Sequence, residues 1–342
     1  MPRTKTSTAT DAPPDWVIDP AAVLAAIRAD LPQAEDARAA RAVAVRHLAA
    51  ARTRATAALD ARFAASPRDS RPITRAQSDL TDAVVQVAFR LASEDFHPAP
   101  NPTEAERIAV LAVGGYGRAE MAPHSDVDLL FLTPWKITPW AESLIETLLY
   151  LLWDLKLKVG HASRTVKDCL RLGREDMTIR TALLEHRHIT GDASLTADLR
   201  EALWSGLFRN SGPEFIEAKL AERAARHRRQ GGQRYVLEPN IKEGKGGLRD
   251  LQTLYWIGKY LYATPDAAGL VAAGLLTADE YATFARAEGF LWAVRCHLHY
   301  IARRAADQLT FDLQVEVAAR MGYKDTGGRR GVEIFMQEYF RH

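Results

Sequence analysis

The stretch VGGYGRAEMAPHSDVDLLFL, residues 113–132, decides the fold of the chain around it. Before it, residues 108–113 (IAVLAV) form a short continuous apolar run, which is typical of a strand buried on both faces, and the run ends at the glycines. Residues 126–132 (DVDLLFL) predict a second strand. Because strand side chains alternate between faces, Asp126 and Asp128 share one face of that strand. The sequence therefore predicts two neighbouring strands with a pair of carboxylates at the start of the second.

The paired carboxylates indicate a cation site. Two like charges this close are tolerated when they are solvated, share a proton or hold a cation between them. Oxygen ligands suit Mg²⁺ or Mn²⁺, and two such ions about 3.5 to 4 Å apart stabilise both the attacking and the leaving oxygen in a phosphoryl displacement. We therefore expect Asp126 and Asp128 to be metal ligands and catalytic residues.

The glycines and their neighbours indicate a phosphate site beside the metals. Gly114 and Gly115 follow a strand, and without side chains they let backbone N–H groups approach a phosphate near a helix N-terminus. Arg118 either contacts phosphate or pairs with a nearby glutamate, and Ser125 either donates to a phosphate oxygen or starts the turn. A second candidate is the glycine-rich loop that carries Lys242, Lys245 and Arg249 before a helix, where we expect phosphate or partner contact.

Composition excludes several classes of protein. The chain has 342 residues, enough for two domains or one large one, and its net charge of +2 from 45 basic and 43 acidic residues gives little support for a nucleic-acid partner. Cys169 and Cys296 lie far apart without metal-ligand spacing, so we expect no disulfide and a cytoplasmic location. The most apolar stretch, residues 144–153, is too short to span a membrane.

The sequence divides into four parts of different character. We expect a disordered tail over residues 1–19, a helical region over residues 20–96, a mixed α+β core over residues 97–190 with a small mixed sheet, and an all-helical domain over residues 191–342. Within the core, residues 157–166 predict a third strand.

Two charged or titratable stretches of the helical part have structural interpretations. The basic run at residues 219–234 is predicted to be a solvated helix face. His297 and His299 are two residues apart, which places them on different faces of a helix, so we expect structural roles and not metal binding.

The chain resembles a known superfamily at the residues described first. GGYGRAE (residues 114–120) and PHSDVDLLFL (residues 123–132) are similar to the DNA polymerase β-like nucleotidyltransferases. Further stretches resemble, in order and spacing, the bifunctional uridylyltransferase/uridylyl-removing enzymes that modify the nitrogen-signalling protein PII. They are LWDLKLKVGHASRT (152–165), REDMTIRTALLEHRHITG (174–191), EPNIKEGKGGLRDLQTLYWI (238–257) and FLWAVRCHLHYIARRAADQLTFDLQ (290–314).

The resemblance implies a fold and an activity. It implies a polymerase β-like core that transfers UMP from UTP to a tyrosine hydroxyl of PII and releases pyrophosphate, with metals on Asp126 and Asp128. Such sites usually include a third carboxylate. Asp154, Asp168 and Asp176 are the candidates, or there is none, and His161 or Ser163 of the third strand faces the site instead.

The family continues into an HD-type phosphohydrolase domain and ACT-type glutamine-sensing domains. This sequence stops within a helical pattern at residues 335–342, so we expect a fragment in which neither uridylyl removal nor glutamine sensing is present.

Three alternatives stay open from the sequence. The first is a nucleotidyltransferase that extends RNA or adenylylates another protein. The second is a nucleotide-binding regulatory module without activity. The third, dinucleotide binding through GGYG, has little support because the G-x-G-x-x-G pattern is incomplete.

Overall fold

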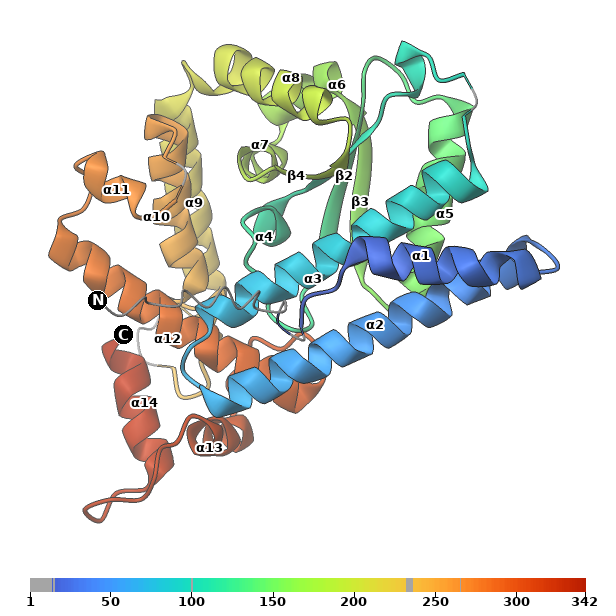
Figure 1. The fold of residues 1–342 in the computed structure, drawn as a ribbon. Helices are drawn as coiled ribbons and strands as arrows, with labels where there is room; N and C mark the ends of the chain where they lie inside the picture. The colour runs from blue at the N-terminus through green and yellow to red at the C-terminus, as the bar shows by residue number, and fades with distance from the viewer. Residues whose placement is uncertain (1–13, 15, 100, 232–235, 265) are drawn as a thin grey trace, which may run out of the picture.

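The chain folds around a small sheet that lies between two sets of helices (Figure 1). The computed structural model describes residue 14 and residues 16–99, 101–231, 236–264 and 266–342. The helices before the sheet are α1 (Pro20–Asp30), α2 (Ala37–Ala65) and α3 (Arg71–Arg90), with the short segments η1 (Leu31–Gln33), η2 (Leu91–Phe96) and η3 (Glu104–Glu106). The predicted α+β class with helical flanks is confirmed.

The sheet is mixed and, in the part of the chain that the structure describes, has four strands. They are β1 (Ala109–Ala112), β2 (Val127–Thr133), β3 (Val159–Thr165) and β4 (Arg187–Gly191), in the order β3-β2-β1-β4. β1 is antiparallel to both β2 and β4, and β2 is parallel to β3. The three predicted strands are confirmed, but β4 was not predicted. Its sequence RHITG is polar with one buried apolar side chain, Ile189, as befits an edge strand.

Both faces of the sheet are covered, as the apolar run of β1 predicts. Val110 and Ala112 pack with the helical layer of α1, α2, α3 and α5 (Pro139–Asp154), whereas Ala109 and Leu111 pack toward α6 (Val166–Glu175), α7 (Met177–Leu184) and α8 (Ala193–Leu203). Figure 1 shows the sheet between these two layers. The functional residues therefore lie at an end of the strands, because the faces are filled by packing.

Side-chain caps set where several helices begin. Asp19 accepts a hydrogen bond from the backbone of α1, Thr138 caps α5 ahead of a proline, and Asp192 caps α8. These caps satisfy N–H groups that have no acceptor inside the helix.

The end of the predicted N-terminal tail belongs to the core. Ile18 is buried among the side chains of α1, α2 and α3, and the guanidinium of Arg62 lies 4.6 Å from the ring centroid of Trp16. The prediction of a disordered tail over residues 1–19 is therefore wrong for residues 16–19. Residues 1–13 and 15 lie outside the described residues.

The C-terminal part is helical, as predicted, and packs on the rest of the chain. Its helices are α9 (Gly212–Arg229), α10 (Leu248–Tyr262), α11 (Gly269–Ala272), α12 (Ala278–Ala302), α13 (Phe311–Arg320) and α14 (Gly331–Arg341), with η4 (Trp204–Phe208) after α8. Phe63 of α2 and Ile73 of α3 share a hydrophobic cluster with α12, α13 and α14. The proposed domain limits stay a prediction. Among the described residues, no helix has the length and apolarity needed to cross a membrane.

Replacement of Phe131 by alanine tests the core of the sheet. Phe131 of β2 is fully buried, so the variant is expected to lower the free energy of unfolding by about 3–5 kcal/mol in urea denaturation. Trp135, just beyond β2, is 57% exposed, and its replacement by alanine should cost less than about 0.5 kcal/mol. Equal losses in the two variants would contradict this arrangement.

Candidate functional site

A cleft of about 490 Å³ lies where the start of β2 meets the glycine turn after β1 and the C-terminal helices. It brings together residues that are more than a hundred positions apart in the sequence. The predicted residues that line it are Gly114, Gly115, Arg118, Ser125, Asp126, Asp128, Lys242 and Arg249. Lys245 does not line this cleft, because its exposed side chain borders a separate pocket beside α14.

Asp128 lies in a space that two glycines leave open. Gly160 of β3 is its register partner, and a Cβ added to Gly160 would lie 2.5 Å from Oδ1 of Asp128. A Cβ on Gly114 would lie 3.6 Å from Oδ2. The carboxylate thus lies between two backbone segments, and the absence of a side chain at Gly160 leaves the room for Oδ1, whereas a Cβ at Gly114 would be at ordinary contact distance.

The charges around Asp128 act on its ionisation. Burial raises the pKa of Asp128, the neighbouring carboxylate of Asp126 raises it further, and Lys242 acts in the opposite direction. Asp126 is exposed at the mouth of the cleft, immediately before β2. Two close carboxylates with one raised pKa form a donor set that a divalent cation would stabilise.

The glycine turn is held against β2 by the backbone. The N–H of Val113 donates to the carbonyl of Asp128 at 3.1 Å, and the chain then enters the short helix α4 (Gly114–Gly117). Gly114 has a φ of +61°, a conformation that glycine adopts without strain. The N–H groups of Gly114 and Gly115 are the first of this helix, so they have no acceptors within it. Gly114 lies beside the carboxylate of Asp128.

Arg118 is committed to two carboxylates. Its side chain is buried and pairs with Glu120 at 2.7 Å and with Glu185 at 2.7 Å, and Glu185 also accepts a hydrogen bond from the indole of Trp256. Although desolvation acts against it, the two carboxylates raise the pKa of Arg118. Pairing with Glu120 was one of the two sequence interpretations, and the guanidinium forms part of the cleft wall.

Ser125 starts the turn into β2. Its Oγ accepts a hydrogen bond from the N–H of Ala122 at 3.0 Å, and its own N–H donates to the carbonyl of Ala122. The hydroxyl proton remains able to donate toward the cleft, so the two sequence interpretations of Ser125 are compatible.

Lys242 and Arg249 carry positive charge across the cleft from the aspartates. Burial lowers the pKa of Lys242, and the nearby charges of Arg295 and Arg249 lower it further. Arg249 lies over the ring of Trp256, with its guanidinium carbon 5.3 Å from the ring centroid, and donates to Gln252 at 3.0 Å. These cations are held close together, and a bound anion would reduce the repulsion between them.

The helix that follows this loop does not offer its N-terminus to a ligand. The N–H of Leu248 donates to the carbonyl of Ile241 at 3.0 Å, and the N–H of Arg249 donates to the carbonyl of Lys242 at 2.9 Å. The tight turn needs Gly247, because a Cβ there would lie 2.6 Å from the carbonyl oxygen of Ile241. The glycines thus fold the loop back on α10, and the loop acts through its side chains.

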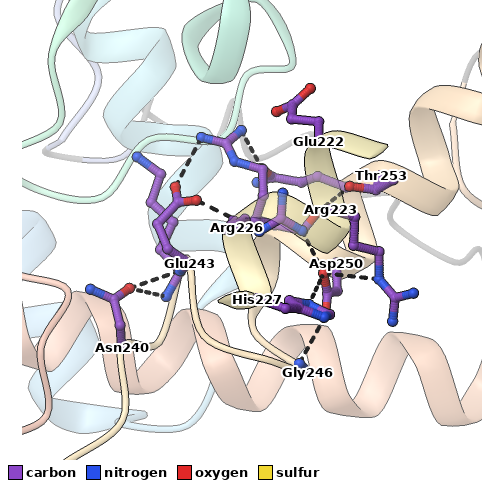
Figure 2. A network of polar contacts seen from close by, with 12 residues as sticks. Glu222, Arg223, Arg226, His227, Asn240, Glu243, Gly246, Asp250 and Thr253 are labelled. Carbon is purple, nitrogen blue, oxygen red and sulfur yellow. Dashed lines mark hydrogen bonds and ion pairs between the residues drawn. The ribbon is translucent and has the colours of Figure 1, made fainter. Parts of the chain in front are cut away.

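Asp250 fixes this loop to α9 (Figure 2). Its carboxylate accepts hydrogen bonds from Arg226 at 2.5 Å and from the N–H of Gly246 at 2.9 Å, and it lies 2.8 Å from Nε2 of His227. Arg223 also pairs with it at 3.2 Å. The carboxylate of Asp250 thus joins the loop that carries Lys242 to the basic side chains of α9.

The basic run of α9 is not a solvated face throughout, which corrects the sequence interpretation. Arg226 is 4% exposed because it binds Asp250, and Lys219 is 2% exposed, lines the cleft and pairs with Glu222 at 2.6 Å. The helical period alone does not reveal which face of α9 is covered by α10. Residues 232–234 of the run lie outside the described residues.

The three candidate third carboxylates lie away from the cleft. Asp154 pairs with Arg41 of α2, Asp168 forms the capping box of α6, and Asp176 caps α7. Among the described residues, no group of three or more His, Cys, Asp or Glu side chains forms a metal site. Mg²⁺ in nucleotide sites is commonly held by one or two carboxylates together with substrate phosphates, and Asp126 and Asp128 fit that pattern.

Sequence reasoning missed several residues of the cleft. Asp307 lines it and pairs with Arg295 at 2.7 Å, and Glu185 and Trp256 form its wall. Asp307, Arg295 and Trp256 lie in or beside the stretches that resemble the family, which was the available signal. His297 and His299 of α12 have structural contacts, as predicted: Nε2 of His297 lies 2.8 Å from the carbonyl of Pro67, and Nδ1 of His299 accepts from the N–H of His124.

Comparison with known proteins agrees with this geometry. The GlnD PII-uridylyltransferase family model matches residues 214–342, and the glutamate-ammonia ligase adenylyltransferase model matches residues 6–145. The bifunctional uridylyltransferase/uridylyl-removing enzyme of Cereibacter sphaeroides is 69% identical over 332 residues, which cover 96% of this chain and 36% of that protein. The chain belongs to the family of these uridylyltransferases.

Other members of the uridylyltransferase family are also matched over most of this chain and about a third of their own length. The protein of the same name from Ruegeria pomeroyi is 61% identical over 325 residues, 95% of this chain and 36% of that protein. The one from Rhodospirillum rubrum is 54% identical over 263 residues, 77% of this chain and 28% of that protein. The chain thus spans about a third of the length of these family members.

Neutralising Asp128 tests its environment. Because its pKa is higher in the folded than in the unfolded protein, ionisation is disfavoured by folding, and this costs stability as pH rises through the unfolded and then the folded pKa. Without divalent cations, D128N is expected to unfold at a higher urea concentration than the wild type at pH 7. The difference in urea midpoint should disappear at pH values below the ordinary pKa of an aspartate, where the carboxyl group is protonated in both the folded and the unfolded protein. A D128N variant that is less stable than the wild type at pH 7 would contradict this.

Removing the charge of Asp250 tests whether this carboxylate holds the loop to α9. D250N leaves the buried Arg226 with a weaker partner, which is expected to cost about 3 kcal/mol in urea denaturation. Hydrogen exchange at residues 240–249 should accelerate, because the N–H of Gly246 loses a charged acceptor. The exposed Asp198 of α8 gives the matched control, D198N, with neither effect. Unchanged exchange in D250N would show that the loop is held by other contacts.

Proposed function

We propose that this chain transfers UMP from UTP to a tyrosine hydroxyl of PII and releases pyrophosphate, using Mg²⁺ or Mn²⁺. One observation carries the proposal: Asp126 and Asp128 share a single cleft with the N–H groups of the glycine turn and with Lys242 and Arg249. The cleft therefore has donors for a cation on one side and positive charge for phosphates on the other. The family of the chain makes uridylyl transfer the first activity to test.

Asp126 and Asp128 are the residues that would hold the metal. Both line the same cleft, and Gly160 leaves the space that Oδ1 of Asp128 occupies. A bound divalent cation would neutralise the charge of the triphosphate and polarise its α-phosphorus.

The transfer is a displacement at the α-phosphorus of UTP. The tyrosine oxygen forms a bond to that phosphorus, the bond to the oxygen bridging the α- and β-phosphates breaks, pyrophosphate takes the electron pair, and the hydroxyl proton passes to solvent or to a carboxylate of the cleft. The N–H groups of Gly114 and Gly115 would bind the departing phosphates, and Lys242 and Arg249 would balance their charge. Positioning and charge supply most of the rate acceleration in such a site.

Two further features fit the proposal, one of them a cytoplasmic location and the other a protein acceptor. Cys169 and Cys296 are buried free thiols, which a reducing compartment maintains. The near-zero net charge favours a protein acceptor over a nucleic acid.

A second candidate is transfer of AMP to a protein. It is favoured by the match of residues 6–145 to the adenylyltransferase model, which includes the glycine turn and both aspartates. The two candidates share every step above and differ in the base.

Labelled nucleotides separate the two. The chain is incubated with Mg²⁺, purified PII and UTP, ATP or CTP labelled at the α-phosphorus, and the labelled residue is located by mass spectrometry. We expect label from UTP on a tyrosine of PII. Label from ATP alone would contradict transfer of UMP. The absence of label from all three nucleotides would favour a regulatory module without activity.

Two variants test the metal-binding carboxylate. D128N should lower kcat by on the order of 10³-fold, because several kcal/mol of charge stabilisation is lost. G160A places a methyl group against Oδ1 of Asp128, and the displaced carboxylate should lower kcat about 10²-fold. The matched control is G289A in α12, where a Cβ has open space, and full activity is expected. A fully active G160A would show that the position of Asp128 is not critical.

A further inference from the structure

A second hollow adjoins the cleft on the side of the exposed aspartate. Its volume is about 180 Å³, and it shares Ser125 and Ala305 with the cleft. Its walls come from α2, from α3, from the turn before β2 and the start of β2, from the turn between α5 and β3, and from the residues after α12. Five separate segments of the chain therefore meet there.

The charge of this hollow is entirely of one sign. Five cations line it, namely Arg52, Lys156, Lys158, Arg303 and Arg304. The chain has 43 acidic residues, but no carboxylate is among the lining residues in the part that the structure describes. With 45 basic residues almost matched by acidic ones overall, a concentration of this kind is a local feature and not a consequence of composition.

The cations lack carboxylate partners. Arg52 donates to the carbonyl of Leu155 at 2.8 Å, and burial lowers the pKa of its guanidinium. Within the described ranges, none of the five forms an ion pair with Asp or Glu, whereas Arg118, Arg187 and Arg295 elsewhere do. A half-buried guanidinium without a counter-charge is stabilised by a bound anion.

The position of the hollow indicates which anion it would meet. Asp126 and His124 are exposed close to one another in the sequence, so an acceptor whose hydroxyl reaches the phosphorus beside Asp126 would also contact His124 and Ser125. The hollow begins at those residues. The glycine turn and Lys242 lie inside the cleft, where they would bind the nucleotide phosphates. Lys156 and Lys158 are exposed instead. Charges that attract a protein partner are typically exposed in this way at the rim of an interface.

We propose that this hollow binds acidic side chains of the protein acceptor, next to the hydroxyl that receives UMP. The inference rests on the proposed transfer to a protein. It adds a contact surface that selects acceptors with Asp or Glu near the target hydroxyl.

Charge reversal at two lysines tests it. Lys156 and Lys158 lie before the start of β3, and the variant K156E/K158E is expected to raise the KM for PII at least about tenfold, with kcat at saturating PII within about twofold of the wild type. The wild-type KM should rise with added salt, and that of the variant should not. The Kd for UTP with Mg²⁺, measured without PII, should be unchanged.

The matched control lies at the other end of the same strands. Lys136 follows β2 and Lys167 follows β3, both are exposed, and K136E/K167E changes the net charge by the same amount. It should leave the KM for PII unchanged. A similar rise in both variants would overturn the proposal, because the effect would then come from net charge.

Direct binding separates this inference from the proposed activity. Binding of PII to the full chain is measured without nucleotide by sedimentation, and separately the binding of a labelled 20-nucleotide single-stranded RNA is measured. Loss of PII binding in K156E/K158E alone supports the docking surface even if no UMP is transferred. The proposal is overturned if PII binding is the same in all three proteins, if the Kd for UTP rises with the KM, or if only RNA binding is lost.

Discussion

The structure depends on the close approach of β2 and β3 at Asp128. The strands are parallel and in register there, and Gly160 opposite Asp128 has no side chain to displace the carboxylate. On the other strand neighbour of β2, the turn at Gly114 closes over the second oxygen. A charged group thus lies between two backbone segments at an end of the inner strand β2, in a sheet whose two faces are filled by apolar packing.

Charged groups elsewhere in the cleft act on the ionisation of Asp128. Burial and the adjacent Asp126 raise the pKa of Asp128, and the charge of Lys242 acts in the opposite direction. Lys242 lies on a loop that is distant from Asp128 in the sequence. The loop is held by Asp250, which binds α9, so the position of the cation depends on packing between two helices. The electrostatic pairing across the cleft therefore makes the C-terminal helices part of the site, together with residues of the sheet and its turns.

Much of the sheet and of the carboxylate pair could be predicted from the sequence because those signals are local. The alternating pattern of residues 126–132 predicted Asp126 and Asp128 on one side, and both line the cleft although β2 begins only at Val127. The apolar run of β1 predicted burial on both faces. The edge strand β4 escaped prediction because a polar pentapeptide has no distinctive period. Lys219 of α9 was misplaced because the side that α10 covers is decided by tertiary packing. The candidate third carboxylates were misleading for a local reason: Asp168 and Asp176 satisfy helix caps.

We propose that Asp126 and Asp128 form a cation site that a nucleoside triphosphate completes. Mn²⁺ binding, followed by electron paramagnetic resonance during titration of the full chain with a non-hydrolysable UTP analogue, tests it most directly. We expect the wild type to bind Mn²⁺ tightly only when the nucleotide is present, and D128N to bind it at least about tenfold more weakly. Equal Mn²⁺ affinity in the wild type and in D128N would contradict it.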